Sequence, residues 1–344
     1  MRVSIGFDGS TSPTDSLAIV QLAEAVGIDS VWNAEHLGLH DAVVPSSTHL
    51  SHTERIEVGI AGFNADSRNP GLLAMEVSSL CKLAPGRVAL QVGSGSAELA
   101  RTIGVTRTVG TLEVVEKFLV TLRTLLSGEA VTESTDAYRL DGFQLRPRVL
   151  APLPLIQLMA MGPRMLELAA RCADGVSLSA GIPTSMIEGS LSLISGHLPT
   201  FERDRNDFRV SAFCTVGYDP TDGDAAYLRA ARNLAHMPVE YLQRLAPELS
   251  LPDQEQLTTT LLEDGPTAAG ALFEEGTTRA MAMVVTNDTL KSGLEEYAAL
   301  GVDELTLMLT GSPKRSLELV RELGRARQSL STTETTTKGA THAK

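Results

Sequence analysis

Short apolar runs alternate with longer amphipathic segments along most of the chain, and this alternation limits the possible fold more than any other feature. Each run is nearly continuous in apolar residues, as expected of parallel strands that are buried on both faces. The segments between the runs repeat apolar residues at helical spacing. Eight strand-then-helix units predict an α/β protein with a (β/α)8 TIM barrel, with a doubly wound open sheet as the alternative. The predicted strands begin at Val3, Ser30, Ile56, Arg87, Pro154, Gly175, Arg209 and Glu304.

Two of the predicted helices share the same ending. Residues 23–32, AEAVGIDSVW, and residues 298–307, AALGVDELTL, both read as the end of a helix, then glycine, then an apolar residue, aspartate and a strand. Glycine adopts the left-handed conformation that closes a helix without steric cost. Gly27 and Gly301 are therefore predicted to cap their helices and turn the chain directly into the next strand.

Three segments depart from a minimal barrel. Residues 138–145 predict a surface hairpin before the fifth strand. Residues from about 221 to 285 are too many for one helix and predict a helical insertion before the last strand, either a lid over the barrel mouth or a packing or oligomer contact. Residues 328–344 contain almost no large apolar side chain, which predicts a disordered tail. Residues 1–327 are predicted to form a single domain.

The overall charge excludes some partners. The formal net charge is −13 and the pI is near 5.0, whereas nucleic acids and anionic membranes are bound by clustered lysine and arginine. No segment has the roughly 18 apolar residues of a membrane span, and the first residues lack the apolar core of a signal peptide. The three cysteines are far apart and include no CxxC pair, which favours a reducing cytoplasm.

The predicted second strand ends in a cluster of ionisable residues. Glu35 and His36 follow the strand directly, and His40 and Asp41 follow at loop distance. Reacting groups of barrels lie at the C-terminal ends of strands, where a histidine exchanges protons near neutral pH. An ordinary solvated loop is the alternative. A metal site is disfavoured, although His49 and His52 are near in sequence, because Gly38 opposes the helix that a His-x-x-x-His pair needs.

Small residues mark the next two strand ends. Ala61 and Gly62 interrupt the third strand and Asn64 follows them, which predicts a bulge where a flat ligand approaches the backbone, or else a tight bend. The fourth strand ends at Gly93 and Gly95, which make room for a ligand or a turn. After the fifth strand, Gly162 and Pro163 open a helix and, with Arg164, make a possible anion site; an ordinary helix start is the alternative.

Taken together, these pieces resemble the bacterial luciferase-like flavin and deazaflavin superfamily, and within it the coenzyme F420-dependent methylenetetrahydromethanopterin reductase branch. The matching stretches are GIDSVWNAEH, RIEVGIAGFNADSRNPGLLAMEVSSLCKLAPGRVALQVGSG, PLIQLMAMGPRMLELAARCADGV and LKSGLEEYAALGVDELTLM. The resemblance implies a barrel that holds the cofactor ring in its mouth, on a bulge with a non-proline cis peptide bond between Ala61 and Gly62.

The resemblance also implies roles for individual residues. Asn64 would contact the cofactor, and residues 160–163, with Ala160 and Met161 first, would line its ring or phosphate side. Glu35 and His36 would match the acidic residue and the functional histidine of the family. The sugar-phosphate dehydrogenases of the superfamily carry a glutamate where this chain has Ser96, and a tryptophan where it has His40, so a sugar phosphate is not the expected substrate.

The function that follows is an F420-dependent oxidoreductase, acting as a reductase of an activated C=C or C=N bond in a small organic substrate. An FMN-dependent monooxygenase is the first alternative. A metal-dependent hydrolase and a non-catalytic flavin-binding barrel are further alternatives. Because barrels of this superfamily often pair through helices, the protein is also expected to form a homodimer.

Overall fold

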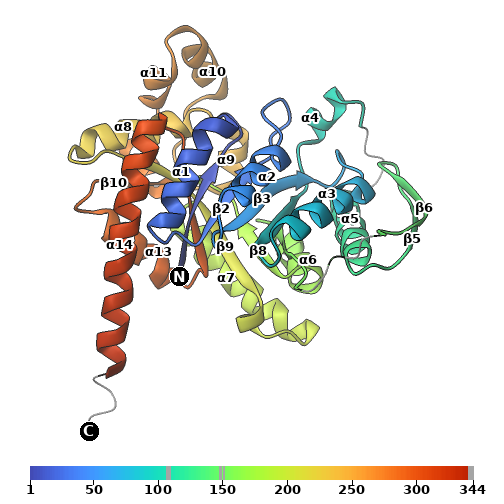
Figure 1. Cartoon of the computed structure of the whole chain (residues 1–344). Coiled ribbons are helices and arrows are strands. Elements are labelled where there is room, and N and C mark those ends of the chain that lie inside the picture. Colours follow the sequence, from blue (N-terminus) through green and yellow to red (C-terminus); the bar gives the residue numbers. More distant parts are fainter. Residues whose placement is uncertain (106–109, 147–148, 150–151, 340–344) are drawn as a thin grey trace.

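A closed barrel of eight parallel strands forms the body of the molecule (Figure 1). This computed structural model describes residues 1–105, 110–146, 149 and 152–339. The strand order is β9-β11-β1-β2-β3-β4-β7-β8, and β8 pairs back with β9. All eight predicted strands are present, so the predicted TIM barrel is confirmed. The barrel strands are β1 (Arg2–Phe7), β2 (Ser30–Ala34), β3 (Glu57–Asn64), β4 (Val88–Gly93), β7 (Leu155–Met159), β8 (Gly175–Leu178), β9 (Arg209–Tyr218) and β11 (Glu304–Met308).

Helices surround the barrel and pack apolar side chains against it. In α5 (Thr111–Leu126) these side chains include Val115, Phe118 and Leu122, all buried. Gly27 and Gly301 have φ of +83° and +91°, which confirms the predicted left-handed helix ends. The other helices of the body are α1 (Pro13–Ala25), α2 (Val43–Ser51), α3 (Pro70–Leu83), α4 (Ala97–Thr102), α6 (Pro163–Cys172), α7 (Thr184–His197), α13 (Leu290–Leu300) and α14 (Pro313–Gly339).

A polar layer around a buried carboxylate fills the barrel interior near the N-terminal ends of the strands. One oxygen of Glu304 accepts hydrogen bonds from the Ser4 hydroxyl at 2.6 Å and from Trp32 Nε1 at 3.0 Å, and it also contacts the Ser30 hydroxyl. The other oxygen lies 3.5 Å from Arg209. Polar groups in a barrel interior need such partners, because an unpaired buried charge is costly.

An aromatic layer lies above this polar layer. The Trp32 indole meets Phe213 edge to face, with ring centroids 6.4 Å apart. Gly59 makes room for the indole, since a Cβ on Gly59 would lie 2.1 Å from it. Trp32 and Phe213 therefore fill the barrel interior, and the barrel mouth lies beyond them at the C-terminal ends of the strands.

The predicted hairpin is present as β5 (Val131–Ser134) and β6 (Arg139–Phe143), an antiparallel pair. The predicted insertion contains helices with a small apolar core of their own. It packs on the mouth side, where Met237 lies against Gly181 in the loop after β8. Its role as a lid stays a prediction. The helices are α8 (Gly223–Leu234), α9 (Val239–Leu245), α10 (Gln254–Glu263), α11 (Pro266–Gly270) and α12 (Glu275–Met281).

The insertion is not wholly helical, which corrects the prediction for residues 221–285. It ends in a ninth strand, β10 (Ala282–Val285), which pairs with residues 215–218 of β9. β9 extends past the end of β8 and leaves a strand edge there, and β10 supplies the missing backbone partners. The short apolar run at residues 282–285 was the sequence signal for this strand.

The final helix runs further than the composition predicts. α14 continues as helix to Gly339, into the segment 328–344 for which the sequence predicts disorder, and Figure 1 shows its last turns extending away from the barrel. Adding residues to a formed helix is much easier than starting one, so polar turns can continue it. The domain boundary at residue 327 stays a prediction, and residues 340–344 lie outside the described part. Among the described residues, no helix is long and apolar enough to span a membrane.

Candidate functional site

His36 lies at the barrel mouth directly after β2, and one hydrogen bond orients its ring. Its Nδ1 lies 2.8 Å from the backbone oxygen of Asp8, which follows β1. A carbonyl oxygen only accepts, so Nδ1 carries the proton and donates. The second ring nitrogen, Nε2, is then the atom that can take or give a proton. The His36 side chain is exposed, so this atom is accessible from the mouth.

Glu35 is held by an arginine that the sequence reasoning did not identify. Both carboxylate oxygens of Glu35 accept from Arg68, at 2.8 Å and 2.6 Å. The same guanidinium donates to Asp41 at 2.7 Å and to Glu76 at 2.9 Å, and it stacks over the Phe63 ring at 4.9 Å. Bidentate pairing of this kind fixes direction as well as charge. Glu35 thus holds the β2 end in place beside His36.

Three carboxylates share this one guanidinium, so the Arg68 cluster of Glu35, Asp41, Glu76 and Arg68 is acidic. Burial raises the pKa of Glu76, and Asp41 and Glu35 raise it further, against the lowering effect of Arg68. Asp41 also accepts from the first amides of α2. Asp41 is therefore neither free in solvent nor directed at the His36 ring: it is paired with Arg68 and holds the start of α2. The polar run between β3 and α3 was the only sequence signal for Arg68.

The remaining histidines of the early cluster do not join His36. His49 is buried, with Nε2 2.9 Å from the Ser16 hydroxyl and Nδ1 3.3 Å from the Asn33 amide. Burial lowers the pKa of His49 to about 4, with a smaller effect from His52. His40 has an exposed side chain. Among the described residues, no three histidine, cysteine, aspartate or glutamate side chains are arranged to hold a metal ion.

The predicted bulge in β3 is present. Its Gly62 forms, together with Gly93 and Met159, a surface at the barrel mouth that is called the bed below. The register between β3 and β4 shifts between Ile60 and Phe63, and Gly62 has φ of +80°. A Cβ on Gly62 would lie 3.5 Å from Met159 Sδ, and one on Gly93 would lie 3.8 Å from Met159 Cβ. The structure therefore brings Gly62 and Gly93 together around Met159, a residue that the sequence reasoning did not select. The cis peptide bond at Ala61, which is buried, stays a prediction.

Asn64 and Gly95 form a close pair at the ends of β3 and β4. A Cβ on Gly95 would lie only 2.6 Å from the side-chain carbon of Asn64, and Gly95 has φ of +61°. Glycine is required there because any other residue would strain the backbone and displace the amide. The pair thus sets the position of the Asn64 side chain at the edge of the bed.

The start of α6 contains the glycine, the proline and the exposed arginine on which the predicted anion site rests, and the anion site itself stays a prediction. Gly162 caps the helix without a side-chain hydrogen bond, and Pro163 is its first residue. Arg164 is exposed, and no residue in the described part of the chain pairs with its guanidinium. Before the helix, Ala160 donates to Ser177 O at 3.2 Å and Met161 Sδ accepts from the Ser179 amide at 3.4 Å. These contacts fix the segment beside the mouth.

Known proteins are similar to most of this chain. The family model described as luciferase-like monooxygenase matches residues 2–304. A 5,10-methylenetetrahydromethanopterin reductase of Methanolobus tindarius is 26% identical over 301 residues, which cover 85% of this chain and 88% of the relative. An F420-dependent glucose-6-phosphate dehydrogenase of Beutenbergia cavernae is 29% identical over 280 residues, which cover 74% and 81%.

Solved structures share the fold. The coenzyme F420-dependent tetrahydromethanopterin reductase of Methanopyrus kandleri superposes with a TM-score of 0.78 at 20% identity, covering 93% of this chain and 96% of that one. The monooxygenase RslO1 of Streptomyces bottropensis superposes with a TM-score of 0.71 at 18% identity, covering 95% and 98%. At these identities the similarity is one of fold. The structures that share this fold include an F420-dependent reductase and a monooxygenase.

Proposed function

The chain belongs to the luciferase-like monooxygenase family, and we propose that it is a coenzyme F420-dependent oxidoreductase that reduces an activated C=C or C=N bond of a small organic molecule. The observation that carries this proposal is the bed of Gly62, Gly93 and Met159 beside the accessible Nε2 of His36. The names of the Methanopyrus and Beutenbergia proteins support F420 as the cofactor of this chain.

The residues of the mouth fit a flat ring with an anionic tail. Gly62 and Gly93 present backbone without side chains, which lets a planar group approach closely. The start of α6 and the Arg164 guanidinium suit the phosphate of the cofactor, because a helix N-terminus attracts anions. Asn64 lies at the edge of the same bed.

The chain's own residues would contribute position and a proton. When bound, F420 supplies the hydride donor or acceptor. The Arg68 cluster holds the β2 end, and the Asp8 carbonyl holds the His36 ring, so Nε2 stays at a constant place beside the bed. His36 Nε2 would then give a proton to the substrate atom that becomes negative, or take it in the reverse direction. Holding the groups in place reduces the entropy cost of reaching the reactive geometry.

A fluorescence titration tests the cofactor assignment. The purified protein is titrated with oxidised F420 and separately with FMN, and we expect saturable binding of F420 only. Gly93→Val is expected to weaken F420 binding at least about tenfold, because its side chain would occupy the bed, while a Cβ at Gly93 would come no nearer than 3.8 Å to its neighbours, so the chain can still fold. Gly189→Val is the matched control, since Gly189 is exposed on α7 and a Cβ there meets nothing within 4 Å.

The outcomes separate the alternatives. Binding of FMN alone, followed by oxygen consumption with the reduced flavin, would favour a monooxygenase. Binding of neither cofactor would remove the enzyme assignment. Equal F420 affinity in the wild type and in Gly93→Val, with both folded by circular dichroism, would place the cofactor elsewhere.

We also propose that the protein forms a homodimer through α2 and α3. These helices pack against each other, and their exposed side chains include Val44, Leu72 and Met75, each at least half exposed. Apolar side chains grouped on neighbouring helices favour a contact between copies. Sedimentation of the wild type is expected to give a dimer and that of Leu72→Glu a monomer. Leu262→Glu, on the exposed face of α10, is the control, and a monomeric wild type would contradict the proposal.

A further inference from the structure

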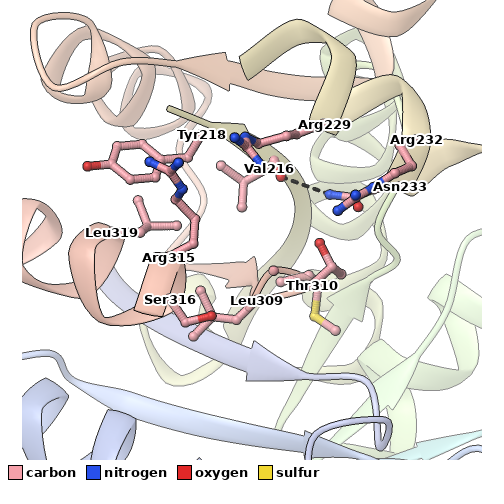
Figure 2. A pocket seen from close by; sticks show the side chains of 12 residues that line it. Val216, Tyr218, Arg229, Arg232, Asn233, Leu309, Thr310, Arg315, Ser316 and Leu319 are labelled. Atoms are coloured by element: carbon pink, nitrogen blue, oxygen red, sulfur yellow. Dashed lines mark hydrogen bonds between the residues drawn. The ribbon is translucent and has the colours of Figure 1, made fainter. Parts of the chain in front are cut away.

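A second pocket, rich in arginine, lies at the C-terminal ends of β9 and β11, outside the cofactor bed. Figure 2 shows Arg229 and Arg232 entering it from α8 and Arg315 from the first turns of α14. Met308, at the end of β11, also lines this pocket. The Met308 sulfur lies over Gly6 of β1, where a Cβ would be 2.6 Å from it. The pocket therefore opens beside the barrel mouth.

The pocket exists because two neighbouring strands have unequal lengths. β11 stops pairing with β9 at Met308 and Thr215, whereas β9 continues to Tyr218. β10 covers the opposite edge of this extension. On the β11 side, the Val216 carbonyl accepts from the Asn233 side chain at 3.1 Å, as Figure 2 shows. The gap above β11 is therefore lined by side chains from α8 and α14.

Two of the three arginines at the pocket are paired with carboxylates, and the third is not. Arg229 and Arg315 each lie 3.3 Å from one oxygen of Asp219, and Arg315 also pairs with Glu318 at 3.1 Å. Arg232 forms no ion pair or hydrogen bond with any residue that the structure describes. Arg232 is therefore a cation at the pocket that has no carboxylate partner among the described residues.

One buried donor at the pocket is also unsatisfied. The Nε atom of Arg229 is buried and has no hydrogen-bond partner among the described residues. Buried polar groups nearly always have partners, so an orphan donor in the same pocket as the unpaired Arg232 indicates an absent acceptor. The hydroxyl of Thr310, at the start of the loop after β11, lines the same pocket and can donate as well.

We propose that this pocket binds an anionic group, a carboxylate or a phosphate, of the substrate whose reduction was proposed above. Arg232 supplies the unpaired charge, and Arg229 Nε and Thr310 complete the donor set. The room in the pocket is about 30 Å³, which suits one small charged group rather than a whole molecule. TIM barrels often bind phosphate at the loops after their seventh and eighth strands, which are β9 and β11 here. The reducible bond would then lie over the mouth, with the anion as its anchor.

Inorganic phosphate is the probe for this site, because it reports binding without turnover. Phosphate is titrated into the protein and followed by ³¹P NMR line width. Arg232→Gln is expected to lose one saturable binding event, or to bind at least about tenfold more weakly, as the loss of a charge-assisted pair requires. Arg321→Gln removes the same charge from an exposed position of α14 and is expected to bind like the wild type. Equal binding by Arg232→Gln and the wild type would overturn the proposal.

A second phosphate titration, with F420 present, shows whether the pocket binds the anionic group of the substrate or that of the cofactor. If the Arg232-dependent phosphate signal persists in the presence of saturating F420, the site serves the substrate. If F420 abolishes this signal and Arg232→Gln weakens F420 binding, the site holds the cofactor and the substrate assignment is wrong. Failure of F420 to bind at all would defeat the proposed function while leaving the phosphate result of the first titration intact.

Discussion

Replacing His36 by alanine is expected to lower the turnover of an F420-loaded enzyme by about 10²- to 10⁴-fold, the usual contribution of a general acid or base. The side chain is accessible at the mouth, and only its Nδ1 is used, by the Asp8 carbonyl. The loss should fall on kcat, because no part of the bed at Gly62 and Gly93 is altered. The affinity for F420 is expected to stay within about twofold of the wild type, by fluorescence titration.

The matched control for this experiment is His40→Ala. His40 is four residues further along the same loop and its side chain is exposed without a hydrogen bond to any described residue. Its removal is expected to leave kcat nearly unchanged. If His36→Ala keeps full turnover, His36 is not the proton donor. If it loses turnover and F420 binding together, His36 belongs to the cofactor site rather than to proton transfer.

The barrel and its mouth could be predicted because their sequence signals are local. An apolar run reports one strand, and a glycine after a helix reports one turn, without knowledge of any other segment. Gly62 and Gly93 were selected in this way, as small residues at strand ends. Met159 was not, since a methionine in a buried strand looks the same whether it faces a helix or the barrel mouth.

The ion pairs could not be predicted because they join distant parts of the chain. Arg68 follows β3, and its partner Glu35 follows β2, 33 residues earlier. Glu304 is 300 residues from Ser4 and 274 from Ser30, and only the barrel register brings them together. One sequence shows that a charge is present but does not show which charge lies opposite. The same limit applied to the arginine pocket, whose three arginines come from two helices far apart in the sequence.

The ninth strand shows a further limit. Residues 282–285 are apolar and follow a helix, which also describes the end of a packed helical insertion. Only the overhang of β9 beyond β8 creates a partner for them. A strand that completes an edge is decided by its neighbour, and the length of β9 depends on the rest of the barrel.

Replacing Glu304 by alanine is expected to have the largest effect on stability. Glu304 is fully buried, so its removal leaves Trp32 Nε1 and the Ser4 and Ser30 hydroxyls with a cavity in place of their acceptor. Removing one partner of a buried pair costs about 3–5 kcal/mol. We expect the lower part of that range, because one of its arginine partners, Arg209, is 22% exposed. The melting temperature should fall by about 4–6 °C in a scanning calorimeter.

Two variants show whether the charge or the hydrogen bonds stabilise this layer. Glu304→Gln keeps an acceptor for Trp32 and is expected to lose less stability than Glu304→Ala. Glu275→Ala breaks an exposed pair with Arg279 and is expected to change stability by less than about 0.5 kcal/mol. If Glu304→Ala is as stable as Glu275→Ala, the buried carboxylate does not stabilise the barrel.

The same carboxylate predicts how stability depends on pH. Burial by itself raises the pKa of Glu304, but Arg2 and the hydrogen bonds from Ser30, Ser4 and Trp32 outweigh it, so the pKa is lowered below 4.5. A lowered folded-state pKa means that the unfolded chain binds the proton more readily. The stabilisation is therefore complete above the unfolded pKa and is lost as the pH falls through the folded pKa. Glu304→Gln should flatten the stability profile below about pH 4.5 and run parallel to the wild type at neutral pH; an unchanged acid profile would show that Glu304 is not the titrating group.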